Sequence, residues 1–367
     1  MNKLLDKLPS ELKKNLRKKT MPNFEKPMLA TLTKNYFDRD DWIYESKFDG
    51  VRCLIFKNKN KVFLKSRNNK SLSDAYPELV EAAKKFRVDQ IILDGEVVAF
   101  KGAVTSFEKL QGRLGLRSAE KALATGIKIH IYIFDILYLD GYELLNLPLI
   151  KRKTILESAI KFKDPIRYTE HKNTKGIKFF KAACKKGLEG IIAKKRDSKY
   201  VHVRSPNWLK FKCVADQELV IGGYTEPQKS RVGFGALLLG YYQPSDFALP
   251  SALKLRRTDR ATTDKSPRLR QASKNGKFMF AGKVGTGFND KFLKDFSKKL
   301  KKIETKKNPF SSKEMEAEDV HFVKPKYVAE IGFEEWTKDN KLRHPRFQGL
   351  RYDKLAKSVV KETPKQK

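Results

Sequence analysis

Cysteine, histidine and long apolar runs are scarce in this chain, and each scarcity excludes a class of protein. The 367 residues include only Cys53, Cys184 and Cys213, which form no CxxC pair; we expect no zinc ribbon or disulfide framework and read all three as plain core or surface residues. The five histidines show no metal-ligand spacing. No apolar run reaches membrane-spanning length, and residues 1–24 lack the apolar block of a signal peptide. We therefore expect a protein that works in the cytoplasm.

Acidic residues are too few to balance the basic ones. The chain carries 79 lysines and arginines against 43 aspartates and glutamates, which leaves a formal net charge of +36. Such an excess on a folded chain most often serves to bind a polyanion, so nucleic acid is the first candidate partner and an acidic membrane surface the second. A hydrophobic content of 40% is enough for a real core, and the length favours two domains.

The texture of the sequence changes near Val214. Residues 25–213 alternate strand-like runs such as "IILDGEVVAF" with helical patterns such as "AYPELVEAAKKF", which predicts helices around a mixed sheet. Residues 214–356 contain short strands, glycine turns and one helical segment, which is typical of a small OB-type β-barrel. A basic helical extension over residues 1–24 precedes these domains, and a basic tail over residues 357–367 follows them.

Charged side chains occur in pairs on otherwise apolar strand-like runs. Side chains two residues apart on a strand share a face, and charges placed there need partners because burying an unpaired charge is very costly. Three such pairs occur, each on its own run: Glu45 with Lys47, Asp94 with Glu96, and Lys210 with Lys212. The first pair is followed by a turn-prone Asp49-Gly50 dipeptide. Carboxylates and lysines of this kind could surround a bound phosphate and a metal ion.

Lys47 is the candidate nucleophile of this set. A lysine attacks only as the free amine, so its pKa must fall from about 10.4 through desolvation or neighbouring cations. Lys194, Lys210 and Lys212 are suitable neighbouring cations. A phosphoryl electrophile would need the same cations and a divalent metal held by one or two carboxylates, and Glu96 and Glu189 fit that requirement. The K-x-D-G motif is short, however, and on these residues alone Lys47 could be one more surface lysine.

A series of short motifs resembles, in order, the motifs of the covalent nucleotidyltransferases. They are "KFDGVR" at 47–52, "SR" at 66–67, "LDGE" at 93–96, "FD" at 134–135, "EGIIAK" at 189–194, "WLKFK" at 208–212 and "RHPRFQGLRYDK" at 343–354. Within that superfamily, "PMLATL", "GALLLGYY" and "AGKVGTGF" look most like the ATP-dependent DNA ligase module of bacterial ligase D. The resemblance implies an α+β fold, with an adenylation (nucleotidyltransferase) domain of mixed and antiparallel sheets followed by an OB-fold domain.

The resemblance also implies a role for each matching residue. Lys47 would attack the α-phosphate of ATP and carry AMP to the 5′-phosphate of nicked double-stranded DNA, whose 3′-OH then seals the nick, in DNA repair and with Mg²⁺ or Mn²⁺ present. The other implied positions are Glu45 at the adenine amino group, Phe134 stacked on the base, Arg52 and Arg67 at the ribose and phosphate or the DNA end, Glu96 and Glu189 at the metal, Lys194, Lys210 and Lys212 at the α-phosphate, and Arg351, Asp353 and Lys354 at the pyrophosphate. The second domain would swing about a pivot near Val214 to deliver the last three.

Several alternatives stay open at this point. An RNA ligase or an mRNA-capping guanylyltransferase would share the lysine chemistry and differ in the nucleotide and polynucleotide accepted, although "PMLATL" and "WLKFK" favour DNA. An NAD-dependent ligase would need a nicotinamide-recognising region and usually a four-cysteine zinc site, which three cysteines argue against. A non-enzymatic OB-fold binder would not explain the paired charges. At the level of residues, Phe134 could belong to the core, Arg351 and Lys354 could be solvated, and Arg67 could lie in a polar turn.

A long insertion is expected over residues 244–274, inside a hairpin of the second domain. It has three prolines, no periodicity, and eight basic side chains against three acidic ones, a net charge of +5. No helical DNA-encircling domain is recognisable before the first domain, so the insertion is either a passive, solvated loop or an arm that holds DNA. The candidate DNA contacts are Arg256, Arg257, Arg260, Arg268 and Arg270. We expect a monomer that could work with end-joining repair proteins.

Overall fold

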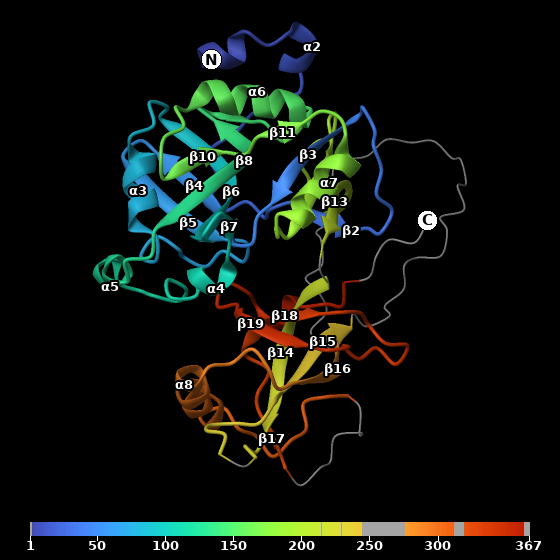
Figure 1. The fold of residues 1–367 in the computed structure, drawn as a ribbon. Coiled ribbons are helices and arrows are strands. Elements are labelled where there is room, and N and C mark those ends of the chain that lie inside the picture. The colour runs from blue at the N-terminus through green and yellow to red at the C-terminus, as the bar shows by residue number, and fades with distance from the viewer. Residues whose placement is uncertain (1, 214, 229, 244–275, 312–318, 363–367) are drawn as a thin grey trace, which may run out of the picture.

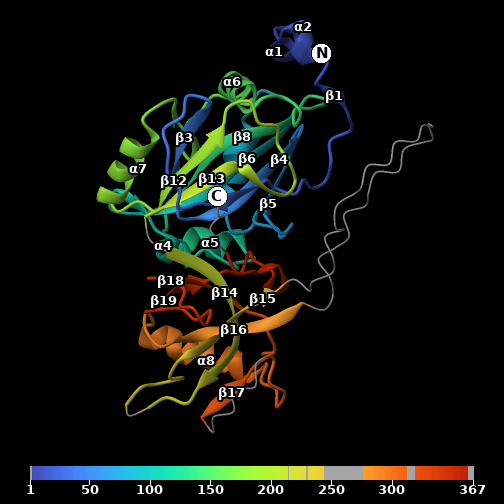
Figure 2. The ribbon, with the colours of Figure 1, turned by 90° about the vertical axis from the view of Figure 1, so that its right-hand side faces the viewer.

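The computed structural model describes residues 2–213, 215–228, 230–243, 276–311 and 319–362 (Figure 1). Residues up to 213 form a body of two sheets with helices around them, and the residues after 214 form a second body around a third sheet (Figures 1 and 2). The predicted α+β fold is therefore confirmed. Among the described residues, no helix is both long and apolar enough to cross a membrane.

The larger sheet of the first domain has eight strands. Its order is β1-β9-β8-β6-β4-β5, with β10 parallel to β8 and β7 beside β6. The strands are β1 (Arg17–Lys18), β4 (Val51–Asn58), β5 (Lys61–Ser66), β6 (Gln90–Lys101), β7 (Val104–Thr105), β8 (Ile129–Leu139), β9 (Tyr142–Glu143) and β10 (Ile166–Tyr168).

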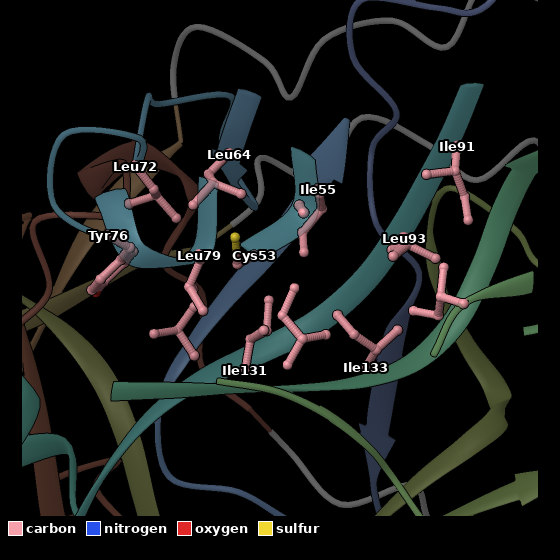
Figure 3. Close-up of a cluster of buried hydrophobic side chains, with 14 of the residues drawn as sticks. Cys53, Ile55, Leu64, Leu72, Tyr76, Leu79, Ile91, Leu93, Ile131 and Ile133 are labelled. Carbon is pink, nitrogen blue, oxygen red and sulfur yellow. The ribbon is translucent and has the colours of Figure 1, made fainter. Parts of the chain in front are cut away.

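Strand β4 shows why the strands of this sheet have nearly continuous apolar sequences. Cys53 and Ile55 point into a large core that is shown in Figure 3, and Leu54 and Phe56 point into a second apolar cluster on the opposite face. Successive side chains of a strand alternate between faces, so a strand buried on both faces needs apolar residues at every position. The large core also includes residues of α3 (Pro77–Lys84) and α6 (Leu149–Ala159). Pro77 occupies the first turn of α3, where its missing N–H is not needed.

The smaller sheet of the first domain carries most of the candidate site. Its order is β11-β3-β12-β13-β2, and β2 runs parallel to β13 while the other pairs are antiparallel. The strands are β2 (Leu29–Leu32), β3 (Trp42–Lys47), β11 (His171–Lys172), β12 (Gly190–Lys195) and β13 (Arg204–Lys212). Helix α7 (Gly176–Lys185) packs Phe180 and Ala183 against Tyr44 and Phe211 of the strands. Both sheets of this domain mix parallel and antiparallel pairs, as predicted.

The sheet of the second domain has the order β16-β15-β14-β18-β19, with β17 beside β14. Its strands are β14 (Ala215–Thr225), β15 (Leu237–Gln243), β16 (Lys277–Val284), β17 (Val320–Phe322), β18 (Val328–Phe333) and β19 (Arg346–Leu350). The N–H of Phe347 donates to the carbonyl of Thr286, just beyond β16, so the two ends of the sheet approach each other as in an OB barrel. The predicted helix is α8 (Asp290–Lys301), capped by the Asn289 side chain and packed through Leu293, Phe296 and Leu300.

The N-terminal extension differs from the predicted helical segment. It contains α1 (Lys3–Asp6), α2 (Ser10–Lys13) and then β1, which pairs with β9. Leu5 is fully buried in the core of the first domain, and other leucines of the segment pack against that core. The leucine spacing thus reflects packing onto the domain and not one continuous helix.

The cysteine prediction was wrong for two of the three residues. Cys184 and Cys213 form a disulfide, and Cys53 is a free thiol in the core. Cys184 lies in α7 and Cys213 follows the last residue of β13, and the packing of α7 on this sheet brings them together. Their separation of 29 residues gave no sign of that proximity. The remaining helices are α4 (Phe107–Leu110), α5 (Ala119–Ala124) and the 3₁₀ helix η1 (Ala356–Ser358).

Candidate active site

The register of β3, β12 and β13 aligns the paired charges predicted from the sequence. Lys47 lies opposite Gly190, and Gly190 lies opposite Lys212. Two residues further along each strand, Glu45 lies opposite Ile192, and Ile192 lies opposite Lys210. Directly opposed residues of adjacent strands place their side chains on the same face. The charged pairs of β3 and β13 therefore share one face, on either side of β12.

Lys47 forms an ion pair with Glu189, the residue before β12. Both side chains are largely buried, and Lys212 Nζ lies 3.8 Å from the same Glu189 oxygen. Burial is the largest single influence and lowers the pKa of Lys47, but the carboxylates of Glu189 and Asp216 together more than offset it, so the net shift is upward. The sequence predicted a lowered pKa from neighbouring cations; the structure shows the opposite because a carboxylate is the nearest partner. Burial raises the pKa of Glu189 to about 7.

Glu45 is held between two buried lysines. Its carboxylate accepts from Lys153 at 2.7 Å and pairs with Lys194 at 2.5 Å. Burial acts to raise the pKa of Glu45, but the two lysines lower it further than burial raises it. Sequence reasoning missed Lys153, which belongs to α6 in a run with no distinguishing pattern. The family resemblance placed Lys194 beside the α-phosphate. In the structure Lys194 forms an ion pair with Glu45.

An aromatic wall borders this group. Phe134 packs edge-to-face on Trp208 with ring centres 6.1 Å apart, and Lys194 Nζ lies 4.2 Å and 4.1 Å from the two ring centres. Phe134 is only 8% exposed, yet it lines the pocket described below. The two readings of this residue, core packing and a surface for a base, are therefore compatible.

Arg52 and Glu96 come from the larger sheet. Arg52 makes two hydrogen bonds to Asp94, at 2.5 Å and 2.6 Å, and its guanidinium carbon lies 4.6 Å from the centre of the Phe134 ring. Glu96 lies opposite Arg52 in the register, and burial raises its pKa to about 7. Asp94 thus serves to fix Arg52, whereas Glu96 faces the pocket. Arg67 also lines the pocket.

The second domain contributes a separate group of charges, which we call the Arg351 cluster. Arg351 donates to Asp353 and to Glu330, in each case at 3.0 Å, and Lys354 pairs with Glu218 at 2.7 Å. Arg351, Asp353 and Lys354 are buried, so they are not the solvated charges of the alternative reading. The carboxylates of Glu218 and Glu330 were not anticipated from the sequence.

Glu362 is a further residue that the sequence did not single out. Its carboxylate pairs with Lys210 at 2.5 Å and with Arg204 at 3.4 Å, and its N–H donates to Gln217. The predicted basic tail, as far as it is described, thus places an acid against Lys210. The loop candidates Arg256, Arg257, Arg260, Arg268 and Arg270, and the predicted pivot Val214, lie outside the described residues.

These side chains enclose a pocket of about 360 Å³ between the two domains. The sequence-predicted residues that line it are Glu45, Lys47, Arg52, Arg67, Glu96, Phe134, Glu189, Lys194, Lys210, Lys212, Arg351 and Lys354, whereas Asp353 lies outside the lining. Among the described residues, no three His, Cys, Asp or Glu side chains gather as a complete metal cage. Glu96 and Glu189 nevertheless suit a divalent ion that takes its other ligands from water and phosphate oxygens, since burial raises the pKa of both carboxylates and a cation would offset that.

Comparison with known proteins agrees with this geometry. Residues 27–212 match the ATP dependent DNA ligase domain, and residues 261–354 match the ATP dependent DNA ligase C terminal region. The chain is 32% identical over 362 residues to the multifunctional non-homologous end joining protein LigD of Pseudomonas aeruginosa, covering 97% of this chain and 39% of that protein. It is 33% identical over 331 residues to DNA ligase 2 of Methanosarcina mazei, covering 84% of this chain and 52% of that protein.

A solved structure of mycobacterial DNA ligase D complexed with ATP and MES is similar with a TM-score of 0.58 and 30% identity, covering 92% of this chain and 98% of that one. The chain spans less than half the length of the LigD proteins it matches. The family matches reach into both domains, and the first of them includes every motif quoted above for the first domain. The chain belongs to the ATP-dependent DNA ligases.

Proposed function

We propose that this chain seals nicks with a 3′-OH and a 5′-phosphate in double-stranded DNA through an AMP adduct on Lys47. The observation that carries the proposal is the position of Lys47 on the wall of a pocket between two domains, paired with Glu189 and in register with Lys212. A pocket of about 360 Å³ is in the range of small-molecule sites. It combines an aromatic wall, several cations and several carboxylates, among them Glu96 and Glu189, which suits a nucleotide bound with a metal ion.

In the first step, the Nζ lone pair of Lys47 attacks the α-phosphorus, a P–N bond forms, and the P–O bond to pyrophosphate breaks. The ammonium must first lose its proton to solvent, so its ion pair with Glu189 has to open. Mg²⁺ or Mn²⁺, when bound, supplies positive charge at the phosphate oxygens, and Glu96 and Glu189 are the residues that would hold it. Separation of Glu189 from Lys47 would remove a partner that raises the pKa of Lys47 and would favour the free amine.

The remaining lining residues suit the other parts of the nucleotide. Glu45, kept ionised by its two lysines, accepts from the adenine amino group, and Phe134 offers its ring to the base. Lys210 and Lys212 stabilise charge on the α-phosphate, and Lys194 adds positive charge to the same pocket from its place beside Glu45. Arg52 and Arg67 contact the ribose and phosphate or the DNA end. Arg351 and Lys354 orient the pyrophosphate while the second domain is closed, and Asp353 holds the Arg351 guanidinium in place for that role.

The later steps use DNA. AMP passes from Lys47 to the 5′-phosphate, and the 3′-OH then displaces it. We infer that the second domain turns away about residues near Val214 between these steps, which makes residues 25–213 the adenylation domain and residues 214–356 the mobile OB-fold domain. Because LigD relatives are named for non-homologous end joining, we place the activity in DNA repair, at the nucleoid in the cytoplasm, as a monomer that could meet end-joining proteins.

Intact-protein mass spectrometry after incubation with ATP and Mg²⁺ or Mn²⁺ tests the proposal. The chain should gain one AMP, Lys47→Ala should gain none, and the exposed-site variant Lys109→Ala should behave as the parent. GTP in place of ATP should give no adduct. Nicked RNA in place of nicked DNA should give no sealing. Full adenylation of Lys47→Ala would assign the nucleophile elsewhere, and use of GTP would favour a capping enzyme.

A further inference from the structure

Gln111 of the first domain makes a reciprocal pair of hydrogen bonds with the main chain of the second domain. Its Nε2 donates to the Leu350 carbonyl and its Oε1 accepts from the Leu350 N–H, each at 3.2 Å. Gln111 follows α4, which lies beside β19 (Figures 1 and 2), and Leu350 is the last residue of β19. A side-chain amide thus binds β19 at the position directly before Arg351.

Two further side chains of the first domain bind the same segment. Lys70 Nζ donates to the carbonyls of Tyr352 and Lys354, at 2.6 Å and 3.0 Å, and Asn68 donates to the Asp353 carbonyl at 3.3 Å. We call Asn68, Lys70 and Gln111 the closure contacts. All three address main-chain atoms, so they fix the path of residues 350–354 and leave its charged side chains free to serve the pocket.

The fit around Gln111 depends on a glycine. Gly349 has φ +155°, and a Cβ at this position would lie 1.7 Å from Gln111 Nε2. A contact that close to a side-chain nitrogen would force Gln111 away from Leu350. The approach of the two domains at this point therefore relies on residues from both of them.

The closure contacts are also linked to the turn that follows Lys47. Asp49 accepts from the Phe107 N–H at 2.9 Å, which ties the first residue of α4 to that turn. The Phe107 ring lies 4.5 Å from the guanidinium carbon of Arg351. The short helix therefore has the Lys47 turn at its beginning and Gln111 directly after its end, and Arg351 packs on its first residue.

From these contacts we propose that Gln111, supported by Lys70, is a positioning residue for the first reaction step. It holds the main chain of residues 350–354 so that Arg351 and Lys354 face the pyrophosphate of ATP. This inference rests on the function proposed above. It predicts that weakening the closure contacts slows formation of the AMP adduct and leaves the sealing of an already adenylated nick unchanged, because the second domain has left this position by then.

Gln111→Glu is the sharpest test, because glutamate has nearly the same shape. Its carboxylate still accepts from the Leu350 N–H but now opposes the Leu350 carbonyl, so one bond is lost and a repulsion is added. Adduct formation at saturating ATP should slow by about tenfold or more, as expected for losing hydrogen bonds of this kind. Gln111→Ala should show a similar loss and Lys70→Met a smaller one. Lys109→Ala, an exposed neighbour on α4, is the matched control.

Each variant is compared with the parent on three measurements: the rate of adduct formation, the sealing rate on a pre-adenylated nick, and the thermal unfolding midpoint. Slower adduct formation with parental sealing and unfolding supports the inference. Parental adduct formation in Gln111→Glu, or an equal loss in both steps, would overturn it. If the parent itself takes up no AMP, the proposed function fails instead, so the two failures are distinguishable.

Discussion

The charges around Lys47 and the Arg351 cluster are both buried, but they are balanced in different ways. Lys47 is balanced by Glu189 within the first domain, and Arg351 and Lys354 are balanced by Glu218, Glu330 and Asp353 within the second. Leaving a buried charge without its partner costs roughly 3–5 kcal/mol. These pairs can stay intact when the domains separate. Lys210 and Lys212 differ, because their carboxylate partners Glu362 and Asp216 lie beyond residue 213.

The contacts that do cross between the domains are of another type. Gln111, Lys70 and Asn68 bind main-chain atoms, and Lys210 pairs with Glu362. Hydrogen bonds between neutral groups each contribute about 0.5–1.5 kcal/mol net and those made by a charged lysine about 1.5–3 kcal/mol, since water replaces them on separation. The two domains are therefore held together by several modest contacts, which suits the domain movement proposed above. Each prediction below changes either a charge within one domain or a contact between the two domains.

The largest effects on catalysis should come from substitutions in the Arg351 cluster and at Glu189 beside Lys47. Lys354→Ala should slow formation of the AMP adduct by about 100-fold, since it removes a cation that stabilises the departing pyrophosphate, and should spare the sealing of a pre-adenylated nick. Glu189→Ala should damage both steps, because phosphate charge and metal are involved in each. Single-turnover assays of the two steps check this. Equal damage to both steps by Lys354→Ala would mean that the Arg351 cluster also acts on DNA.

A smaller effect is expected from the insertion at residues 244–274, which lies outside the described residues. Strands β15 and β16 pair up to Gln243 and Lys277, so a short Asn-Gly turn can replace the insertion. If the insertion holds DNA, its removal should weaken binding to nicked duplex and flatten the salt dependence by roughly one unit of log K per log salt for each lost phosphate contact. Formation of the AMP adduct should not change. Parental affinity and slope would identify the insertion as passive.

The parts of the site that the sequence predicted correctly are the local ones. Glu45 and Lys47 share a face because strand geometry has a period of two, and the same holds for Lys210 and Lys212. The strand runs, the helix at α8 and the hairpin flanking the insertion follow from equally local patterns. Helices around a mixed sheet, followed by an OB-type barrel, could be predicted on these grounds, whereas the adenylation domain was implied by the family resemblance.

The partners of these charges could not be predicted, because they are distant in the sequence. Lys153 is 108 residues from Glu45, and Glu362 is 152 residues from Lys210. Neither residue belongs to a recognisable motif, and only the packing of α6 and of the C-terminal segment brings them to the pocket. The raised pKa of Lys47 has the same origin, since it depends on the position of Glu189 and not on the lysines counted from the sequence.

The smallest predicted effect concerns Glu362, the acid that faces Lys210 across the domains. Burial lowers the pKa of Lys210 to about 8 even with this carboxylate present, so Lys210 loses its charge as the pH rises through that value. Glu362→Gln removes a competitor for the nucleotide phosphates and also removes a group that raises the pKa of Lys210. Near pH 7 the KM for ATP should therefore fall by about two- to threefold, and the alkaline loss of adduct formation should begin at a lower pH than in the parent. Adduct formation measured from pH 6 to 10 checks both, with the exposed carboxylate variant Glu335→Gln as control. An unchanged KM together with an unchanged pH profile would show that Glu362 has left Lys210 before ATP binds, which would move the pairing from the nucleotide-free protein to another stage of the cycle.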